Sequence, residues 1–137
     1  MWIFLNDAFL SIVDPGRQGP RGGDYLLVRA RAKGDIESVF PKARVWTLPN
    51  RDYGFRAFVP RQIVAKSMAK QVMGIDYTNF KNSVDSDCRH GAYSRVWGAM
   101  YGFQETLAGQ TPESHDEAIK RDFDDFRMPL FDKDVPF

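Results

Sequence analysis

The N-terminal half of the chain is patterned as short β-prone runs separated by turn residues. Residues 2–5 and 8–13 are rich in apolar and aromatic side chains and flank Asn6-Asp7, two residues that tolerate the left-handed backbone of a tight turn. This pattern predicts a β-hairpin at the start of the chain. One continuous strand with a bulge at Asn6 is the alternative, because Asn-Asp lacks the glycine that makes such a turn signal strong.

Residues 25–33 alternate between two faces, as a half-buried strand does. One face is apolar and consists of Leu26, Val28, Ala30 and Ala32. The other face consists of Leu27, Arg29, Arg31 and Lys33. The sequence therefore predicts a strand whose outer face is largely cationic.

Glycine and proline interrupt the chain on both sides of this strand. Residues 14–24 hold four Gly and two Pro in eleven positions, so no regular structure is expected there. After Gly34, residues 35–40 predict one or two helical turns with Asp35 as the N-cap. The side chains expected on the inner side of these turns are Ile36, Val39 and Phe40.

A second strand pair is predicted at 43–48 and 53–59, around the turn residues 49–52. The residues expected to share one face of its second strand are Tyr53, Phe55, Ala57 and Val59.

From Pro60 onward the apolar period changes to that of a helix, and Pro60 itself suits a first helical position. The stripe that follows is Ile63, Val64, Met68, Val72 and Ile75. A shorter helix is predicted at 77–84 and a longer one at about 87–107, with Ser86 or Asp87 at its N-cap. The apolar stripe of the longer helix is Tyr93, Val96, Trp97, Met100, Tyr101 and Leu107. We expect Trp97 to be buried.

Strands come first and helices last, which favours an α+β domain: an antiparallel sheet covered on one face by helices. The core residues predicted for it are Val28, Phe55, Met68, Trp97 and Met100. We expect a single domain over residues 1–110, followed by an acidic helix and an extended tail at 111–137.

The predicted tail combines acidic and apolar residues. A polar disordered tail rarely carries large apolar side chains, so this segment is expected to dock on the domain, on a second subunit of a dimer, or on a partner. The residues predicted for that docking are Phe123, Phe126, Leu130, Phe131 and Phe137.

Charge is distributed unevenly along the chain. Lys and Arg total 19 against 18 Asp and Glu, which is far from the balance of a dedicated nucleic-acid binder. Residues 1–110 nevertheless hold 15 basic and 10 acidic residues, whereas 111–137 hold 4 and 8. The single cysteine and the absence of a cationic leader or a long apolar run predict a cytoplasmic protein that is not inserted in a membrane.

Cys88 and His90 form the densest group of reactive side chains, together with Asp87. Residues two apart on a helix point in different directions, so Cys88 and His90 are not expected to share a proton. A lone cysteine is usually a small buried residue, and Asp87 with His90 falls short of the three or four ligands of a metal site. The glycines of 14–24 precede a strand instead of opening a helix, which argues against a phosphate-binding loop. No catalytic residue, metal or cofactor is predicted.

The basic strand face is the most substantive candidate site. Exposed strands also carry Arg and Lys for solubility alone. A cationic sheet with stacking aromatics is typical of sheet-based RNA readers, but the aromatic signatures of such readers are missing from this sequence. The aromatics available for stacking are Trp46, Tyr53 and Phe58, and Arg44 and Arg51 also lie in this region. The residues predicted to bind nucleic acid or a protein partner are Arg17, Arg21, Arg29, Arg31, Lys33 and Arg56.

Three stretches resemble a group of small uncharacterised bacterial and phage proteins: the opening MWIFLNDAFLSIV, residues 26–41 and residues 89–97. The resemblance extends over about residues 1–103 and implies a prokaryotic or phage source and an intracellular setting; no activity is attached to the group. Together these features predict a non-enzymatic interaction protein that presents a charged surface to a macromolecular partner, such as an inhibitor of a host nucleic-acid-handling or defence complex. The alternative is a small nucleic-acid-binding accessory domain that uses the basic sheet face.

Overall fold

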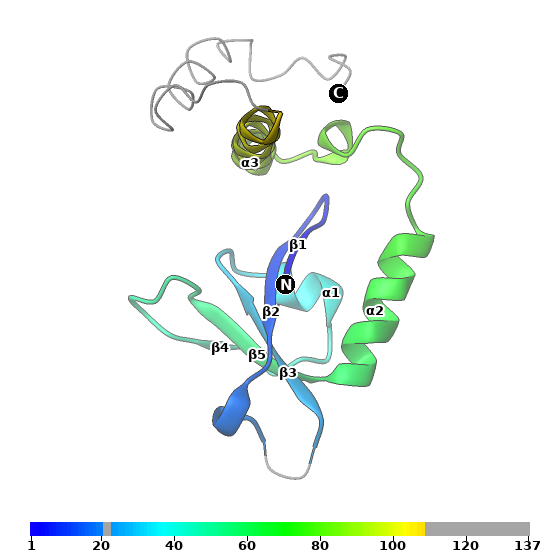
Figure 1. The fold of residues 1–137 in the computed structure, drawn as a ribbon. Coiled ribbons are helices and arrows are strands. Elements are labelled where there is room, and N and C mark those ends of the chain that lie inside the picture. The colour runs from blue at the N-terminus through cyan, green and yellow to red at the C-terminus, as the bar shows by residue number, and fades with distance from the viewer. Residues whose placement is uncertain (21–22, 109–137) are drawn as a thin grey trace. The chain divides into compact units, whose positions relative to one another are not determined.

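The computed structural model describes residues 1–20 and 23–108 (Figure 1). The chain forms two compact units, Met1–Asp76 and Tyr77–Phe137. Arg21 and the whole predicted tail, including the docking residues expected between 123 and 137, lie outside the described residues.

The first unit is built on a five-stranded antiparallel sheet, which confirms the predicted α+β class and the N-terminal hairpin. In spatial order the strands are β1 (Trp2–Phe4), β2 (Phe9–Val13), β3 (Tyr25–Ala30), β5 (Phe55–Pro60) and β4 (Trp46–Thr47). Each pairs with its neighbours in an antiparallel register, with Val28 opposite Ile12 on one side and opposite Ala57 on the other.

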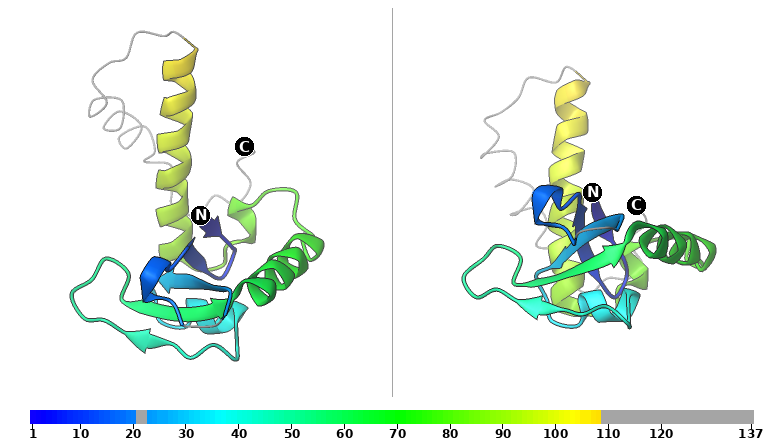
Figure 2. Two further views of the ribbon diagram at one scale, coloured as in Figure 1. Left: turned by 60° about the horizontal axis from the view of Figure 1, so that its bottom comes forward. Right: turned by 90° about the horizontal axis from the view of Figure 1, so that it is seen from below.

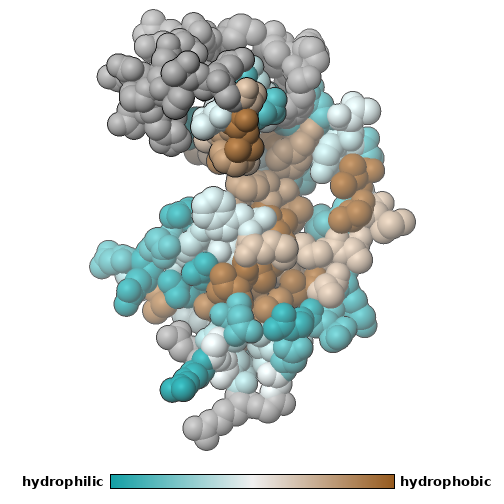
Figure 3. All heavy atoms as spheres, in the orientation of Figure 1, coloured by the Kyte–Doolittle hydropathy of each residue, from teal (hydrophilic) through white to brown (hydrophobic). Residues whose placement is uncertain are grey.

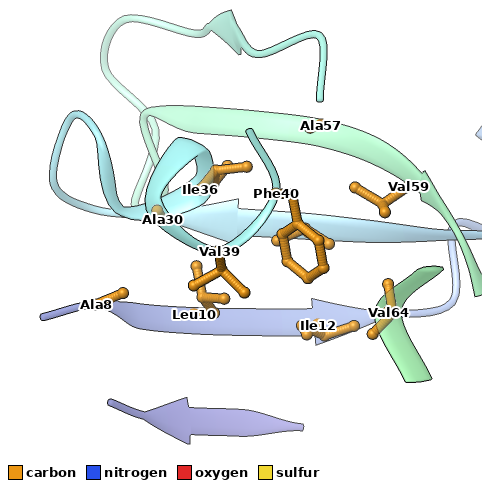
Figure 4. Close-up of a cluster of buried hydrophobic side chains, with 11 residues drawn as sticks. Ala8, Leu10, Ile12, Ala30, Ile36, Val39, Phe40, Ala57, Val59 and Val64 are labelled. Carbon is orange, nitrogen blue, oxygen red and sulfur yellow. The ribbon is translucent and has the colours of Figure 1, made fainter. Parts of the chain in front are cut away.

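Two helices of this unit contact the sheet: α1 (Asp35–Val39) lies against β2, β3 and β5, and α2 (Arg61–Met73) lies against β3 and β5. Between them and the sheet lies the hydrophobic core (Figure 4). Its members are Ala8, Leu10, Ile12, Val28, Ala30, Ile36, Val39, Phe40, Ala57, Val59 and Val64. Phe55 and Met68 pack against this cluster while remaining partly exposed. Of the residues predicted for the core, Val28 therefore belongs to it, and Phe55 and Met68 lie at its border.

Several local predictions near β3 are wrong. The strand ends at Ala30 instead of 33, and Ala32 is exposed. A short turn of 3-10 helix forms at Gly16–Gln18 within the segment expected to be irregular. The N-cap of α1 is Gly34, with φ of 94°, and Asp35 is the first helical residue. The reason is tertiary: Asp35 is buried, and its Oδ2 accepts a hydrogen bond from the backbone N–H of Phe9 at 2.9 Å.

The stripe predicted on α2 is only partly used. Val64 is buried and Met68 packs on the core, but Ile63, Val72 and Ile75 are 46%, 64% and 54% exposed. The helix begins directly after β5, so its first turns meet the sheet and its later turns extend past it. Similarly, the predicted strand at 43–48 is reduced to Trp46–Thr47.

The second unit contains a 3-10 turn at Lys81–Ser83 in place of the helix predicted at 77–84. This turn is followed by α3 (Asp87–Leu107). The bounds of α3 match the prediction, and the Ser86 hydroxyl caps it by accepting from the backbone N–H of Arg89. Trp97 is half-buried instead of buried, with its ring 5.5 Å from that of Tyr101 and 4.7 Å from Lys81 Nζ.

Met100 is 58% exposed, which contradicts its placement in the core. Met100 lies seven positions, or about two turns, after Tyr93 and therefore on the same face of α3. The buried residues Gly91, Tyr93 and Ser94 all lie in the first half of the helix, and Met100 lies in the largely exposed second half. Partial burial lowers the pKa of Lys81 below the ordinary lysine value, since desolvation disfavours its charged form.

None of the described helices has both the length and the apolar composition that crossing a bilayer requires.

Candidate functional site

One row of side chains crosses all five strands on the face of the sheet opposite the core. Directly paired residues of adjacent strands project to the same side. The register gives the order Trp2, Ser11, Arg29, Arg56 and Trp46. The core residues Leu10, Val28 and Ala57 occupy the alternate positions, so this row belongs to the second face. Trp46, on the edge strand, also packs in part against the core cluster. The structure therefore places Arg29 on the face opposite the core, as the alternation in the sequence predicted.

Tyr53 gathers the arginines at one end of this face. The guanidinium carbon of Arg29 lies 4.6 Å from the centre of the Tyr53 ring, and that of Arg31 lies 4.5 Å from it. Arg56 Nε donates a hydrogen bond to the Tyr53 carbonyl at 3.2 Å. We call Arg29, Arg31, Tyr53 and Arg56 the arginine corner. The ring quadrupole attracts both guanidinium groups and holds them near one another despite their like charge.

Asp52 compensates part of that charge and ties the loop to the sheet. Its carbonyl accepts from Arg31 Nη1 at 2.7 Å, and its Oδ1 lies 3.8 Å from Arg56 Nη2. The same Oδ1 accepts from the backbone N–H of Tyr53. Asn50, with φ of 61°, supplies the left-handed residue of the turn between β4 and β5. The sequence reading treated Asp52 only as a turn residue and missed this role.

Tyr53 was predicted to share a face with Phe55, Ala57 and Val59, and this is wrong. Its ring lies with Arg29, on the opposite side of the sheet from the core cluster. Regular β5 begins only at Phe55, and Gly54 precedes it with its carbonyl accepting from the Leu48 N–H. The two-residue alternation therefore does not extend back to Tyr53.

Arg29 is held by a second contact that the sequence did not reveal. Its Nη2 donates to Ser11 Oγ at 2.8 Å across the β2–β3 pair. Its Nε is buried and has no hydrogen-bond partner among the described residues. An unpaired buried donor of a charged group destabilises the fold, so the contacts that hold this guanidinium in place are those with Tyr53 and Ser11.

The edge of the sheet beside the corner carries aromatic rings. Trp46 on β4 lies 4.9 Å, centre to centre, from Phe58 on β5, and both are half-buried. Trp46 pairs directly with Arg56. An aromatic pair and a cation therefore sit side by side on the same edge.

Positive charge predominates in this part of the chain. Residues 25–34 and 44–60 contain six basic side chains and one acidic side chain, Asp52. The six are Arg29, Arg31, Lys33, Arg44, Arg51 and Arg56. The β4–β5 loop projects from the sheet (Figure 2), and hydrophilic residues gather over it at the left of Figure 3. Because Arg31 and Arg51 are exposed, their charge is available to a ligand.

Not all of the predicted basic residues meet. Lys33 is exposed in the turn after β3, close in sequence to the corner, but Arg17 lies in the 3-10 turn after β2, at the other end of the sheet. The length of β3 separates these ends by about 17 Å. The structure therefore supports one cationic corner instead of a continuous basic face.

The other end of the sheet is largely neutralised. Arg61 Nε donates to Asp24 Oδ1 at 2.8 Å, and its Nη2 lies 3.5 Å from Asp14 Oδ2. The hydrogen bond and the charge of Asp24 raise the pKa of Arg61 further above its ordinary value.

Asp87, Cys88 and His90 lie in the first turn of α3. Cys88 is exposed at the start of α3, and not buried as a lone cysteine usually is. Within the described part of the chain, no three His, Cys, Asp or Glu side chains are placed to hold a metal ion. The expectation that neither thiol nor metal chemistry resides here stays a prediction.

Neither a protein-family model, nor a characterised protein, nor a solved structure matches this chain. What the site can do therefore follows from its own residues. Fixed guanidinium groups, exposed arginines and an adjacent aromatic pair can bind anionic groups and planar groups together.

Proposed function

We propose that the protein is a non-enzymatic binding protein whose arginine corner contacts a negatively charged macromolecular partner. The observation that carries the proposal is the attachment of Arg29, Arg31 and Arg56 to one buried tyrosine, within a region of six basic residues and one acidic residue. Cations held by strands and by a tethered loop lose little conformational entropy on binding, which favours affinity.

A function as an inhibitor of a host nucleic-acid-handling or defence complex is a narrower form of this proposal. A protein that covers an anionic partner would deny it to such a complex. The bacterial or phage setting implied by the resemblance is compatible with that role. The direct test is whether the corner binds polyanions at all.

Charge reversal at two exposed arginines, Arg31→Glu in the corner with Arg51→Glu in the adjoining β4–β5 loop, is expected to weaken binding of a polyanion about tenfold or more, since each lost contact removes a counterion-releasing interaction. Fluorescence anisotropy with labelled heparin and with labelled oligothymidylate measures the effect. The matched control is Lys66→Glu with Lys70→Glu: it changes net charge equally, but on exposed positions of α2, which starts at the opposite end of β5.

Equal weakening by both double variants would show that only net charge matters, and the arginine corner would then have no special role. Absence of binding by the unmodified protein to either polyanion would refute the proposed function.

A further inference from the structure

We infer that the partner of the arginine corner is a single-stranded nucleic acid, whose bases stack beside the corner on Trp46, Phe58 and the guanidinium plane of Arg31. The inference rests on the proposed function and narrows it from polyanions in general to a polymer that has both phosphates and planar bases.

The aromatic pair on the edge of the sheet offers a surface on which a base can stack. Trp46 and Phe58 come from adjacent strands, their rings are tilted by 40°, and each keeps part of its surface exposed. A base stacked on an aromatic side chain stabilises single-strand complexes with little regard to sequence. Arg56 stands directly opposite Trp46 in the ladder, but its side chain is 18% exposed and paired with Asp52. The cations offered to the phosphates of a stacked strand are therefore the exposed Arg31 and Arg51.

Arg31 offers a second flat surface for a base, and this surface is charged. Its side chain is exposed, yet its guanidinium rests on Tyr53 and donates to the Asp52 carbonyl. Tyr53 itself is 3% exposed, so it positions the arginines and offers no surface for a base. A guanidinium fixed in this way presents a flat cation, which bases stack on and phosphates accept hydrogen bonds from.

The same features favour a single strand over a duplex and over other polyanions. In a duplex the bases stack on one another and their faces are inaccessible to side chains, whereas unpaired bases can splay onto aromatic and guanidinium planes. A polysaccharide sulfate or an acidic protein segment uses the cations of the corner but leaves the aromatic pair unused. The coexistence of both features on one edge favours a single strand.

The test compares three probes on the unmodified full chain: labelled oligothymidylate, an abasic phosphodiester strand of equal length and charge, and a duplex of that length. The expected result is binding of oligothymidylate about tenfold or more tighter than binding of the abasic strand, because stacking is lost with the bases. The duplex is expected to bind more weakly than the single strand as well.

Two variants locate the stacking surface. Arg31→Lys keeps the charge and removes the plane, so it should weaken oligothymidylate binding several-fold and leave abasic binding unchanged. Trp46→Ala should act in the same direction. Its control is Phe103→Ala on α3 of the second unit, an aromatic side chain that is 54% exposed and lies outside the sheet, which should leave both affinities unchanged.

Equal affinity for the oligothymidylate and abasic strands would overturn this inference and leave the polyanion proposal standing. Equal or tighter binding of the duplex would overturn it likewise. Failure of all three probes and of heparin to bind would overturn the proposed function itself. Should Trp46→Ala fail to fold, the probe comparison and Arg31→Lys still decide.

Discussion

Replacing Leu10 by alanine is expected to lower the free energy of unfolding by about 2–5 kcal/mol, because the substitution leaves a cavity that the core fills only in part. Leu10 is fully buried at the centre of β2 and belongs to the cluster between the sheet and the two helices of the first unit. Urea titration followed by circular dichroism measures the loss.

Leu107→Ala is the matched control, since it removes the same atoms from a side chain that is 72% exposed at the end of α3. It should change the free energy of unfolding by less than about 0.5 kcal/mol. Similar losses in the two variants would mean that the core does not lie on the Leu10 face of the sheet.

The second large effect concerns Tyr53→Ala, for which we expect a loss of about 3–5 kcal/mol in the free energy of unfolding. Removal of the ring leaves a cavity and deprives Arg29 and Arg31 of the surface on which both guanidinium groups lie. The three arginines of the corner then repel one another with only Asp52 to compensate. The same urea titration measures this loss.

Tyr53→Phe retains the ring and should cost less than about 1.5 kcal/mol, with oligothymidylate affinity unchanged. If the phenylalanine variant were as unstable as the alanine variant, the hydroxyl and not the ring would be the stabilising group. Retained stability in Tyr53→Ala would show that the ring does not hold the corner together.

The sequence predicted the elements of the fold better than their contacts. Alternation in β3 and the apolar spacing and cap of α3 are local signals. Both elements form and begin where expected, although β3 ends at Ala30 instead of 33. Which part of an apolar stripe is buried depends on the neighbours of the helix: Val64 and Ile63 are adjacent in sequence, but the first is 3% and the second 46% exposed. Local spacing carries no information on where a helix leaves the sheet.

The candidate site was predictable in composition but not in geometry. Alternation placed Arg29 on the second face and strand pairing could have placed Arg56 beside it. The position of Tyr53 was not predicted because the break at Gly54 shifts it out of the alternation of β5. The contact between Ser11 and Arg29 was not predicted because it joins residues 18 positions apart. Arg17 was grouped with these residues by charge alone, and the antiparallel register places it at the other end of the sheet.

The dependence of oligothymidylate affinity on salt concentration tests the central claim most directly. The logarithm of the association constant should fall linearly with the logarithm of salt concentration, with a slope of about −0.7 per phosphate neutralised on a single strand. The account predicts that Arg31→Ala reduces the magnitude of this slope by about 0.7, whereas Lys66→Ala leaves it unchanged. Identical slopes for the unmodified protein and Arg31→Ala would contradict the assignment of the arginine corner as the phosphate-binding site.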